Sequence, residues 1–183
     1  MEILKTKIKD LLIIKPSIFG DNRGYFFESY NKAKFKSLGL DLSFVQDNQS
    51  MSHKGVLRGL HFQAPPYQQG KLVRVIKGSV MDVAVDIRTN SPTYGNYESI
   101  VLSGDNKLQF WIPPGFAHGF ITLEDNTIFS YKCTGIYSKE SEGSIVWNDK
   151  DININWGIET PIVSEKDQNA TTLDKLNSPF SYA

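Results

Sequence analysis

The stretch LVRVIKGSVMDVAVDIR, residues 72–88, contains two strand-like halves on either side of a glycine. The second half alternates with a period of two and places its apolar side chains on one face: Met81, Val83, Val85 and Ile87. The opposite face carries the remaining residues: Asp82, Ala84, Asp86 and Arg88. Because Lys77-Gly78-Ser79 between the halves is typical of a tight turn, the stretch predicts a β-hairpin.

Short β-like runs continue towards the C-terminus and are separated by Gly, Asn, Asp or Pro. They are YESIVLS (97–103), KLQFWIP (107–113), GFITLE (119–124), TIFSYKC (127–133) and SIVWND (144–149). Helical patterns between them are too few for a parallel α/β sheet. The series therefore predicts an all-β-dominated fold, an antiparallel sandwich or barrel with a few short helices.

The two ends of the chain read differently from this central β region. Near the N-terminus, Asn31 can cap and Gly39 can end a short helix over about residues 32–38. Beyond about residue 150 the chain is polar and irregular, so we expect this tail to contribute by docking onto the β core. A length of 183 residues fits a single domain, 1–183, with docked N- and C-terminal extensions.

Composition limits the classes of partner. Lysine plus arginine and aspartate plus glutamate both number 20, which leaves no basic surplus for nucleic acid. No apolar run approaches the roughly 20 residues that cross a bilayer, and the N-terminus lacks a secretory signal pattern. The single cysteine, Cys133, fits a reducing compartment. We therefore expect a cytoplasmic protein that binds neither nucleic acid nor membrane.

The run GVLRGLHFQ, residues 55–63, carries Arg58 and His61 inside apolar, strand-like sequence. Both side chains are costly to bury without partners. They are three residues apart, so strict alternation would place them on opposite faces of a strand. A β-bulge at Gly59 would reset the alternation and bring both to one face, and projection from a twisted strand end is the alternative. Lys71 lies close to both in sequence. We expect them to line a polar pocket.

A second unusual run is WIPPGFAHGF, residues 111–120, in which Pro113, Gly115 and His118 have the P-x-G-x-x-H spacing of the second cupin motif. Cupins are small β-barrels with the site in the open mouth. Metal-binding cupins also need a paired H-x-H and a carboxylate, and this sequence has no H-x-H. The pattern favours a metal-free cupin over a zinc or iron site, and over a metal-dependent cupin oxygenase as the alternative.

The run SYKCTGIYS, residues 130–138, supplies Tyr131 and Tyr137. A strand tyrosine is ordinarily a packing residue whose hydroxyl reaches water. A barrel mouth that already contains His61 and Lys71, however, lacks a weak proton donor, and a phenol with a pKa of about 10 is one. Tyr131 is therefore a candidate general acid.

Several of these motifs together resemble the dTDP-4-dehydrorhamnose 3,5-epimerase family, from about Gly20 to about Leu173. They are RGLHFQ (58–63), QGKLVRV (69–75), DVAVDIR (82–88), SPTYG (91–95), WIPPGFAHGF (111–120) and YK (131–132). The resemblance implies a cupin or jelly-roll β-barrel, a homodimer, no metal and no organic cofactor. It also implies a place in the synthesis of nucleotide sugars for rhamnose-containing surface polymers.

Carried over by position, the resemblance implies that His61 is the general base and Asp167 the carboxylate that orients it. It implies Tyr131 as general acid and Lys71 near the ketone oxygen. Tyr137 matches a residue that stacks on the nucleobase. Further positions match contacts to the nucleotide sugar: Arg23, Glu28, Gln46, Asn48, Arg58, His118, Glu142 and Lys166.

The implied reaction is inversion at C3 and C5 of dTDP-4-dehydro-6-deoxy-D-glucose through an enolate, giving dTDP-4-dehydro-L-rhamnose. A 3-epimerase, a 5-epimerase or a 3,4-ketoisomerase would use similar residues, so these alternatives stay open. A non-catalytic cupin that binds a sugar nucleotide is a further alternative. The sequence does not distinguish dTDP from CDP or GDP.

Overall fold

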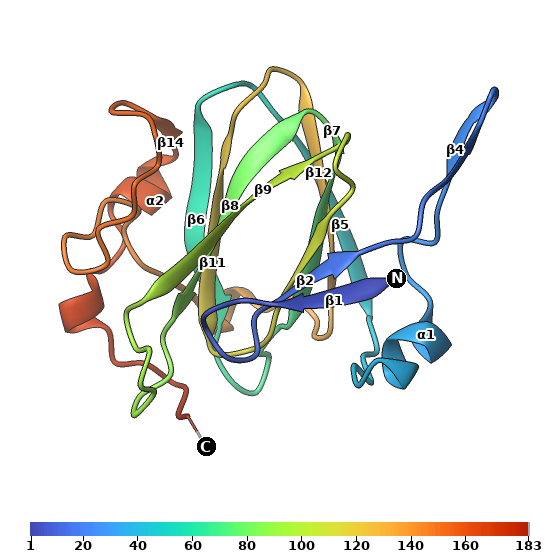
Figure 1. Cartoon of the computed structure of the whole chain (residues 1–183). Coiled ribbons are helices and arrows are strands. Elements are labelled where there is room, and N and C mark those ends of the chain that lie inside the picture. The colour runs from blue at the N-terminus through green and yellow to red at the C-terminus, as the bar shows by residue number, and fades with distance from the viewer. Residues whose placement is uncertain (183) are drawn as a thin grey trace.

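The structure is a computed structural model that describes residues 1–182, and strands dominate it (Figure 1). The first sheet has six antiparallel strands in the order β1 (Glu2–Lys5), β2 (Leu12–Lys15), β10 (Gln109–Ile112), β7 (Lys71–Lys77), β12 (Thr127–Cys133) and β5 (Gln46–Ser52). The second runs β13 (Glu142–Ser144), β6 (Val56–Gln63), β11 (Phe116–Thr122), β8 (Ser79–Asp86) and β9 (Tyr97–Ser103). The two sheets face each other as the walls of a barrel, which confirms the predicted β fold.

Smaller elements surround the two sheets. The short strand β14 (Ile162–Val163) pairs in parallel with β6. Strands β3 (Phe19–Asp21) and β4 (Gly24–Phe26) form a separate hairpin that projects away from the barrel (Figure 1). The helical segments are α1 (Lys32–Ser37), α2 (Glu165–Gln168) and the 3₁₀ turns η1 (Lys139–Ser141) and η2 (Leu173–Lys175). None of the helices in residues 1–182 has the length and hydrophobicity needed to cross a bilayer.

The hairpin predicted for residues 72–88 is wrong, because its two strands belong to different sheets. Strand β7 pairs with β10 and β12, whereas β8 pairs with β9 and β11. Gly78 forms the corner between them with a φ of +78°, and a Cβ at this position would collide with Thr127. The glycine therefore turns the chain from one barrel wall to the other.

The alternation within β8 is as predicted, and each face packs into a different core. Val80 and Ala84 belong to the cluster inside the barrel, which also contains Phe110 and Phe129. Val83 and Val85 point outward into a second cluster that the C-terminal segment completes: Ile145, Ile152, Trp156 and Leu173. A third cluster lies under α1, where Phe35 packs against the first sheet.

The predicted helix is confirmed as α1. The Asn31 side chain accepts a hydrogen bond from the Lys34 N–H and caps the helix, as the sequence indicates. Gly39 follows the last turn with a φ of +88°, a conformation that glycine adopts without steric cost. Burial of Phe35 fixes this short helix against the outside of the first sheet.

The expected strand over residues 144–149 is wrong beyond Ser144, where β13 ends. Ile145 lies just outside the strand, where its backbone exchanges two hydrogen bonds with Leu60 of β6 and forms an isolated bridge to Thr171. The chain then turns, because the buried Asp149 carboxylate accepts hydrogen bonds from the Asp151 and Ile152 backbone N–H groups. From there the tail returns to β6 through β14 and α2, so it docks on the second sheet (Figure 1).

Candidate active site

A bulge in β6 brings Arg58 and His61 to one side of the strand. His118 of β11 pairs with His61 and Phe120 pairs with Arg58, so one intervening residue on β11 opposes two on β6. The register shift lies at Gly59, whose φ is +134°. The bulge predicted at Gly59 is therefore confirmed, and it turns both polar side chains towards the same space.

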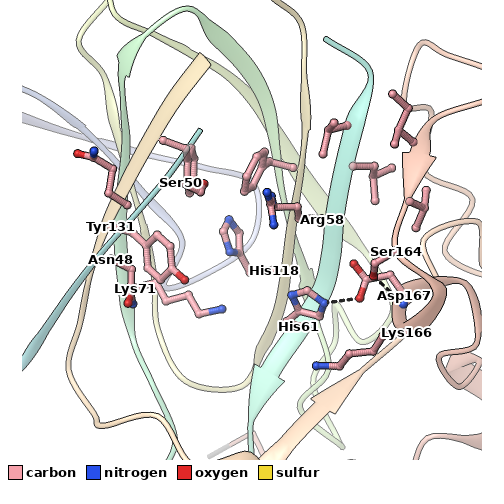
Figure 2. A pocket seen from close by; sticks show the side chains of 17 residues that line it. Asn48, Ser50, Arg58, His61, Lys71, His118, Tyr131, Ser164, Lys166 and Asp167 are labelled. Atoms are coloured by element: carbon pink, nitrogen blue, oxygen red, sulfur yellow. Dashed lines mark hydrogen bonds and ion pairs between the residues drawn. The ribbon is translucent and has the colours of Figure 1, made fainter. Parts of the chain in front are cut away.

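This space is a cavity of about 590 Å³ between the two barrel walls. Figure 2 shows His61 on one side and Tyr131 on the other, with Lys71 and His118 between them. The cavity collects eight of the predicted site residues: Asn48, Arg58, His61, Lys71, His118, Tyr131, Lys166 and Asp167. They come from strands β5, β6, β7, β11 and β12 and from helix α2.

His61 and Asp167 form a close pair although they are far apart in sequence. His61 Nε2 lies 2.7 Å from Asp167 Oδ1, and the Gly59 N–H donates to Oδ2 at 3.2 Å. Ser164 caps α2 by accepting a hydrogen bond from the Asp167 N–H, which fixes the carboxylate at the start of the helix. The His61 side chain keeps 30% of its surface exposed to the cavity, whereas Asp167 keeps 5%.

The surroundings of Asp167 favour its charged form. Burial by itself would raise the pKa of Asp167, but the hydrogen bonds from His61 and Gly59 outweigh it and lower the pKa. The carboxylate therefore stays ionised at neutral pH. Its negative charge can stabilise an imidazolium on His61, as expected of a carboxylate that supports a general base.

A second histidine–aspartate pair lies deeper in the same cavity. His118 Nε2 lies 3.0 Å from both carboxylate oxygens of Asp82, and both residues are buried. Burial raises the pKa of Asp82 and lowers the pKa of His118. The alternation of residues 80–87 predicts the strand face on which Asp82 lies but assigns it no role. The available signal was a carboxylate in an otherwise apolar strand, which needs a partner when buried.

Lys71 and Tyr131 lie on the wall formed by the first sheet. Burial lowers the pKa of Lys71, against the attraction of Cys133, Asp82 and Glu142. Burial also raises the pKa of Tyr131. The phenol therefore keeps its proton well into the alkaline range, and the ammonium gives up its proton more readily than an exposed lysine does.

Three predicted residues lie beside the cavity rather than in its lining. The Glu142 carboxylate binds Lys166 Nζ at 2.5 Å and accepts a hydrogen bond from the Tyr137 hydroxyl at 3.1 Å. Gln46 Oε1 accepts the Tyr137 backbone N–H at 3.0 Å. Gln46, Tyr137 and Glu142 are thus connected to the pocket through Lys166.

Arg23 and Glu28 lie outside the pocket of their own chain. Arg23 stands on the tip of the β3–β4 hairpin, where its side chain is 86% exposed and pairs only with the neighbouring Asp21 among the described residues. Glu28 follows the hairpin and binds Lys34 and Asn31 at the start of α1. Within residues 1–182, no group of three or more His, Cys, Asp or Glu side chains is placed to hold a metal ion.

A cupin-like β-barrel with an imidazole–carboxylate pair and a phenol on opposite sides of one cavity is an arrangement typical of enzymes that move protons by acid–base chemistry. Comparison with known proteins makes this specific. A family model for dTDP-4-dehydrorhamnose 3,5-epimerase matches residues 5–175. The chain belongs to the dTDP-4-dehydrorhamnose 3,5-epimerase family, so the predicted family and the isomerase class are confirmed.

Individual relatives cover nearly the whole chain. The dTDP-4-dehydrorhamnose 3,5-epimerase of Salmonella typhimurium is 55% identical over 177 residues, which cover 96% of this chain and 97% of the relative. The crystal structure of the Elizabethkingia anophelis enzyme has a TM-score of 0.93 at 52% identity and covers 97% of this chain and 99% of that one. The Legionella pneumophila enzyme, solved with dTDP-4-keto-L-rhamnose, has a TM-score of 0.95 at 48% identity and covers 100% and 98%.

Proposed function

We propose that this protein converts dTDP-4-dehydro-6-deoxy-D-glucose into dTDP-4-dehydro-L-rhamnose by inverting C3 and C5. The observation that carries the proposal is the placement of His61 and Tyr131 on opposite sides of one cavity, with Lys71 between them (Figure 2). Family membership and the 4-keto sugar bound by the Legionella pneumophila relative support the same substrate.

The chemistry of the substrate explains why a cation is needed. The hydrogens on C3 and C5 are both adjacent to the C4 ketone, so removal of either one gives an enolate with negative charge on O4. A carbon acid of this kind is far weaker than imidazolium, and a base alone is insufficient. We assign Lys71 to stabilise the charge on O4, since a cation in a water-poor cavity interacts strongly with a developing anion.

Inversion requires that the proton leaves from one face of the ring and returns to the other. In our proposal, neutral His61 removes the proton and Asp167 stabilises the resulting imidazolium. Tyr131 delivers a proton from the opposite face. Each general acid or base step of this type contributes about 10² to 10⁴ in rate. Arg58, with its planar fork of donors, is assigned to the diphosphate.

The reaction can be tested with dTDP-4-keto-6-deoxyglucose in D₂O, followed by proton NMR. A 3,5-epimerase incorporates deuterium at both C3 and C5 and yields the L-configured ring. A single-site epimerase inverts one centre, a 3,4-ketoisomerase moves the ketone to C3, and a binding protein leaves the sugar protons unchanged. Full activity after treatment with a chelator is expected because the proposed route uses side chains alone.

The same assay separates the two proton-transfer roles. Tyr131→Phe removes the proposed proton donor but leaves His61 and Asp167 in place. We expect this variant to lose inversion while it retains more of the hydrogen exchange at C5. Equal loss of exchange and inversion would contradict the division of roles between Tyr131 and His61.

We also propose that the protein acts in the cytoplasm as a homodimer in which the β3–β4 hairpin of one subunit reaches the pocket of the other. The support is an exposed arginine at the hairpin tip, Arg23, together with three exposed aromatic rings: Phe19, Tyr25 and Phe26. Exposed apolar groups of this kind mark surfaces that bind another protein. The free Cys133, buried in the barrel, is compatible with a reducing compartment.

Complementation between two inactive variants tests this arrangement. In a mixed dimer of Arg23→Ala and His61→Asn subunits, one pocket would receive both an intact His61 and an intact Arg23 if the hairpin acts on the partner. We expect activity to return when the two variants are mixed and allowed to exchange subunits. A mixture that stays inactive while it forms mixed dimers would place Arg23 in the pocket of its own chain or outside both.

A further inference from the structure

The loop that carries Tyr137 is held by three glutamine side chains from three different parts of the chain. Gln69 Nε2 donates to the Gly135 carbonyl at 2.8 Å. Gln46 Oε1 accepts the Tyr137 backbone N–H at 3.0 Å, and Gln63 Oε1 accepts the Ser138 N–H at 2.7 Å. Backbone groups within residues 135–138 are therefore satisfied by side-chain amides instead of by a strand ladder.

The three glutamines are themselves placed by the barrel. Gln46 is the first residue of β5, and Gln63 is the last residue of β6 and is only 4% exposed. Gln69 lies just before β7, next to Gly70, whose N–H donates to Thr134 Oγ1. Hydrogen bonds thus hold the loop against the ends of strands from both sheets. Because each one is made by an uncharged amide, no charge has to be buried.

The side chain of Tyr137 is fixed at its other end. Its hydroxyl donates to Glu142, and Glu142 also binds Lys166 of the pocket wall. Glu142 in turn lies opposite Gln63 in the β13–β6 register. With its backbone held by Gln46 and its hydroxyl by Glu142, the ring has little freedom to rotate, yet 50% of the residue remains exposed.

We infer that Gln63, together with Gln46 and Gln69, is a positioning residue that preforms Tyr137 as a flat surface for the nucleobase. This inference rests on the proposed function. A preformed aromatic surface binds a base without the entropic cost of ordering a loop at the moment of binding. The three glutamines therefore set the affinity for the nucleotide half of the substrate, whereas proton transfer at the sugar depends on other side chains.

The arrangement also changes how Gln46 is understood. The family resemblance places Gln46 among the contacts to the nucleotide sugar. In this structure its Oε1 binds the Tyr137 N–H, and its Nε2 donates to Asn48 Oδ1 at 3.1 Å. Gln46 thus connects a residue that lines the pocket, Asn48, with the loop that carries Tyr137. The family resemblance assigns no contact with the nucleotide sugar to Gln63 or Gln69.

A double-mutant cycle on dTDP binding tests the inference by calorimetry. Gln63→Met keeps the side-chain length but removes the acceptor of the Ser138 N–H, and it should weaken dTDP binding about tenfold, as loss of one buried hydrogen bond does. The kcat at saturating substrate should stay within about twofold. In a Tyr137→Ala background the same change should cost almost nothing, because the loop then has no ring to position.

Two controls make the cycle specific. Inorganic pyrophosphate, which has no base, should inhibit Gln63→Met as strongly as it inhibits the unmodified protein. Asn106→Leu removes a comparable tie in a distant turn, where Asn106 Oδ1 accepts the Ser103 and Leu108 N–H groups, and it should leave dTDP binding unchanged. If Gln63→Met does not fold, Gln69→Met enters the same cycle, because it removes the tie to Gly135 from a less buried position.

The outcomes separate this inference from the proposed function. Unchanged dTDP affinity in Gln63→Met, additive losses in the double variant, or an equal loss in Asn106→Leu would each overturn the positioning role while epimerisation by the unmodified protein stands. Failure of the unmodified protein to bind dTDP or to exchange hydrogen at C3 and C5 would overturn the proposed function and the inference with it.

Discussion

The barrel mouth contains two histidine–aspartate pairs with the same chemistry and different surroundings. His61–Asp167 lies at the edge of the cavity, where the imidazole is part-exposed and the carboxylate also accepts a hydrogen bond from the Gly59 backbone N–H. His118–Asp82 lies deeper, with both side chains almost completely buried. The comparison shows that access to water and the supply of donors to the carboxylate, more than the residue types, decide which pair can carry charge.

The difference appears in the direction of the pKa shifts. Hydrogen bonds lower the pKa of Asp167 despite its burial, so its carboxylate is negatively charged beside the imidazole at neutral pH. For Asp82 and His118, burial dominates and favours the neutral form of each side chain. The outer pair is therefore suited to take up a proton, and the inner pair to hold a fixed hydrogen-bond arrangement at the base of the cavity.

The largest expected effect comes from removing each imidazole in turn. His61→Asn should lower kcat by about 10³-fold or more and abolish exchange of the C5 hydrogen in D₂O, because it removes the proposed general base. His118→Asn should lower kcat by about tenfold, the effect of losing one hydrogen bond. Proton NMR of both variants measures these rates. Equal loss of exchange in the two variants would remove the distinction between the pairs.

Replacing the carboxylates should also lower kcat more in the outer pair than in the inner pair, but both losses should be smaller than those of the matching histidine variants. Asp167→Asn keeps the shape of the outer pair and removes its charge, so the imidazolium is no longer stabilised. We expect kcat to fall by about 10²-fold. Asp82→Asn removes a group whose burial already favours the neutral form, and kcat should change several-fold at most. Steady-state kinetics at pH 7 decides, and a larger loss for Asp82→Asn would reverse the assignment.

Lys71 lines the same cavity from the wall formed by the first sheet, and the pH dependence of activity sharpens the comparison. Burial lowers the pKa of Lys71, so its ammonium is present below the lowered value and is lost as the pH rises through it. Tyr131, with a raised pKa, remains protonated over that range. Activity should therefore fall on the alkaline side as Lys71 deprotonates. Lys71→Arg should move that fall to higher pH, whereas Lys71→Gln should be weakly active at every pH.

The smallest expected effect is on stability. The pKa of Asp167 is lowered by folding, so its contribution to the free energy of unfolding is present above about pH 4 and is lost as the pH falls through the folded value. The pKa of Asp82 is raised, so folding favours its protonated form and that contribution is lost as the pH rises. Each pKa unit corresponds to about 1.4 kcal/mol.

Urea unfolding at several pH values measures this contrast. Relative to the unmodified protein, Asp167→Asn should lose more stability at pH 7 than at pH 3, and Asp82→Asn should lose more at pH 3 than at pH 7. A single sign of the pH dependence for both variants would show that the two carboxylates have the same ionisation state in the folded protein.

Much of the fold and of the pocket could be predicted because local sequence dictates it. The two faces of β8 follow from its two-residue period. The bulge at Gly59 follows from the spacing of Arg58 and His61, because residues three apart lie on opposite faces of a regular strand. The error at Gly78 has a physical reason: a glycine corner that carries the chain between sheets has the same local pattern as a hairpin turn. A hairpin turn and a corner between sheets differ only in the distant strands with which each half pairs. Alternation with a period of two carries no information about that pairing.

The parts of the site that were missed depend on contacts between distant segments. The alternation in β8 places Asp82 on the face opposite Met81 and Val83. It does not identify the partner of Asp82, which is His118, 36 residues away. Gln63 and Gln69, which hold residues 135–138 together with the predicted Gln46, are ordinary polar residues in sequence, and only the folded barrel brings them to one loop. The assignment of Asp167 came from resemblance, since its pairing with His61 depends on how the tail docks.

The contact between Gly59 and Gly119 limits how this pocket can be redesigned. A Cβ at Gly59 would lie 2.5 Å from the Gly119 Cα, and one at Gly119 would lie 2.8 Å from the Arg58 carbonyl. The two main chains therefore touch at the point where β6 and β11 present their histidines. A redesign for another ketosugar therefore has to keep both glycines, because a methyl group at either one would force β6 and β11 apart.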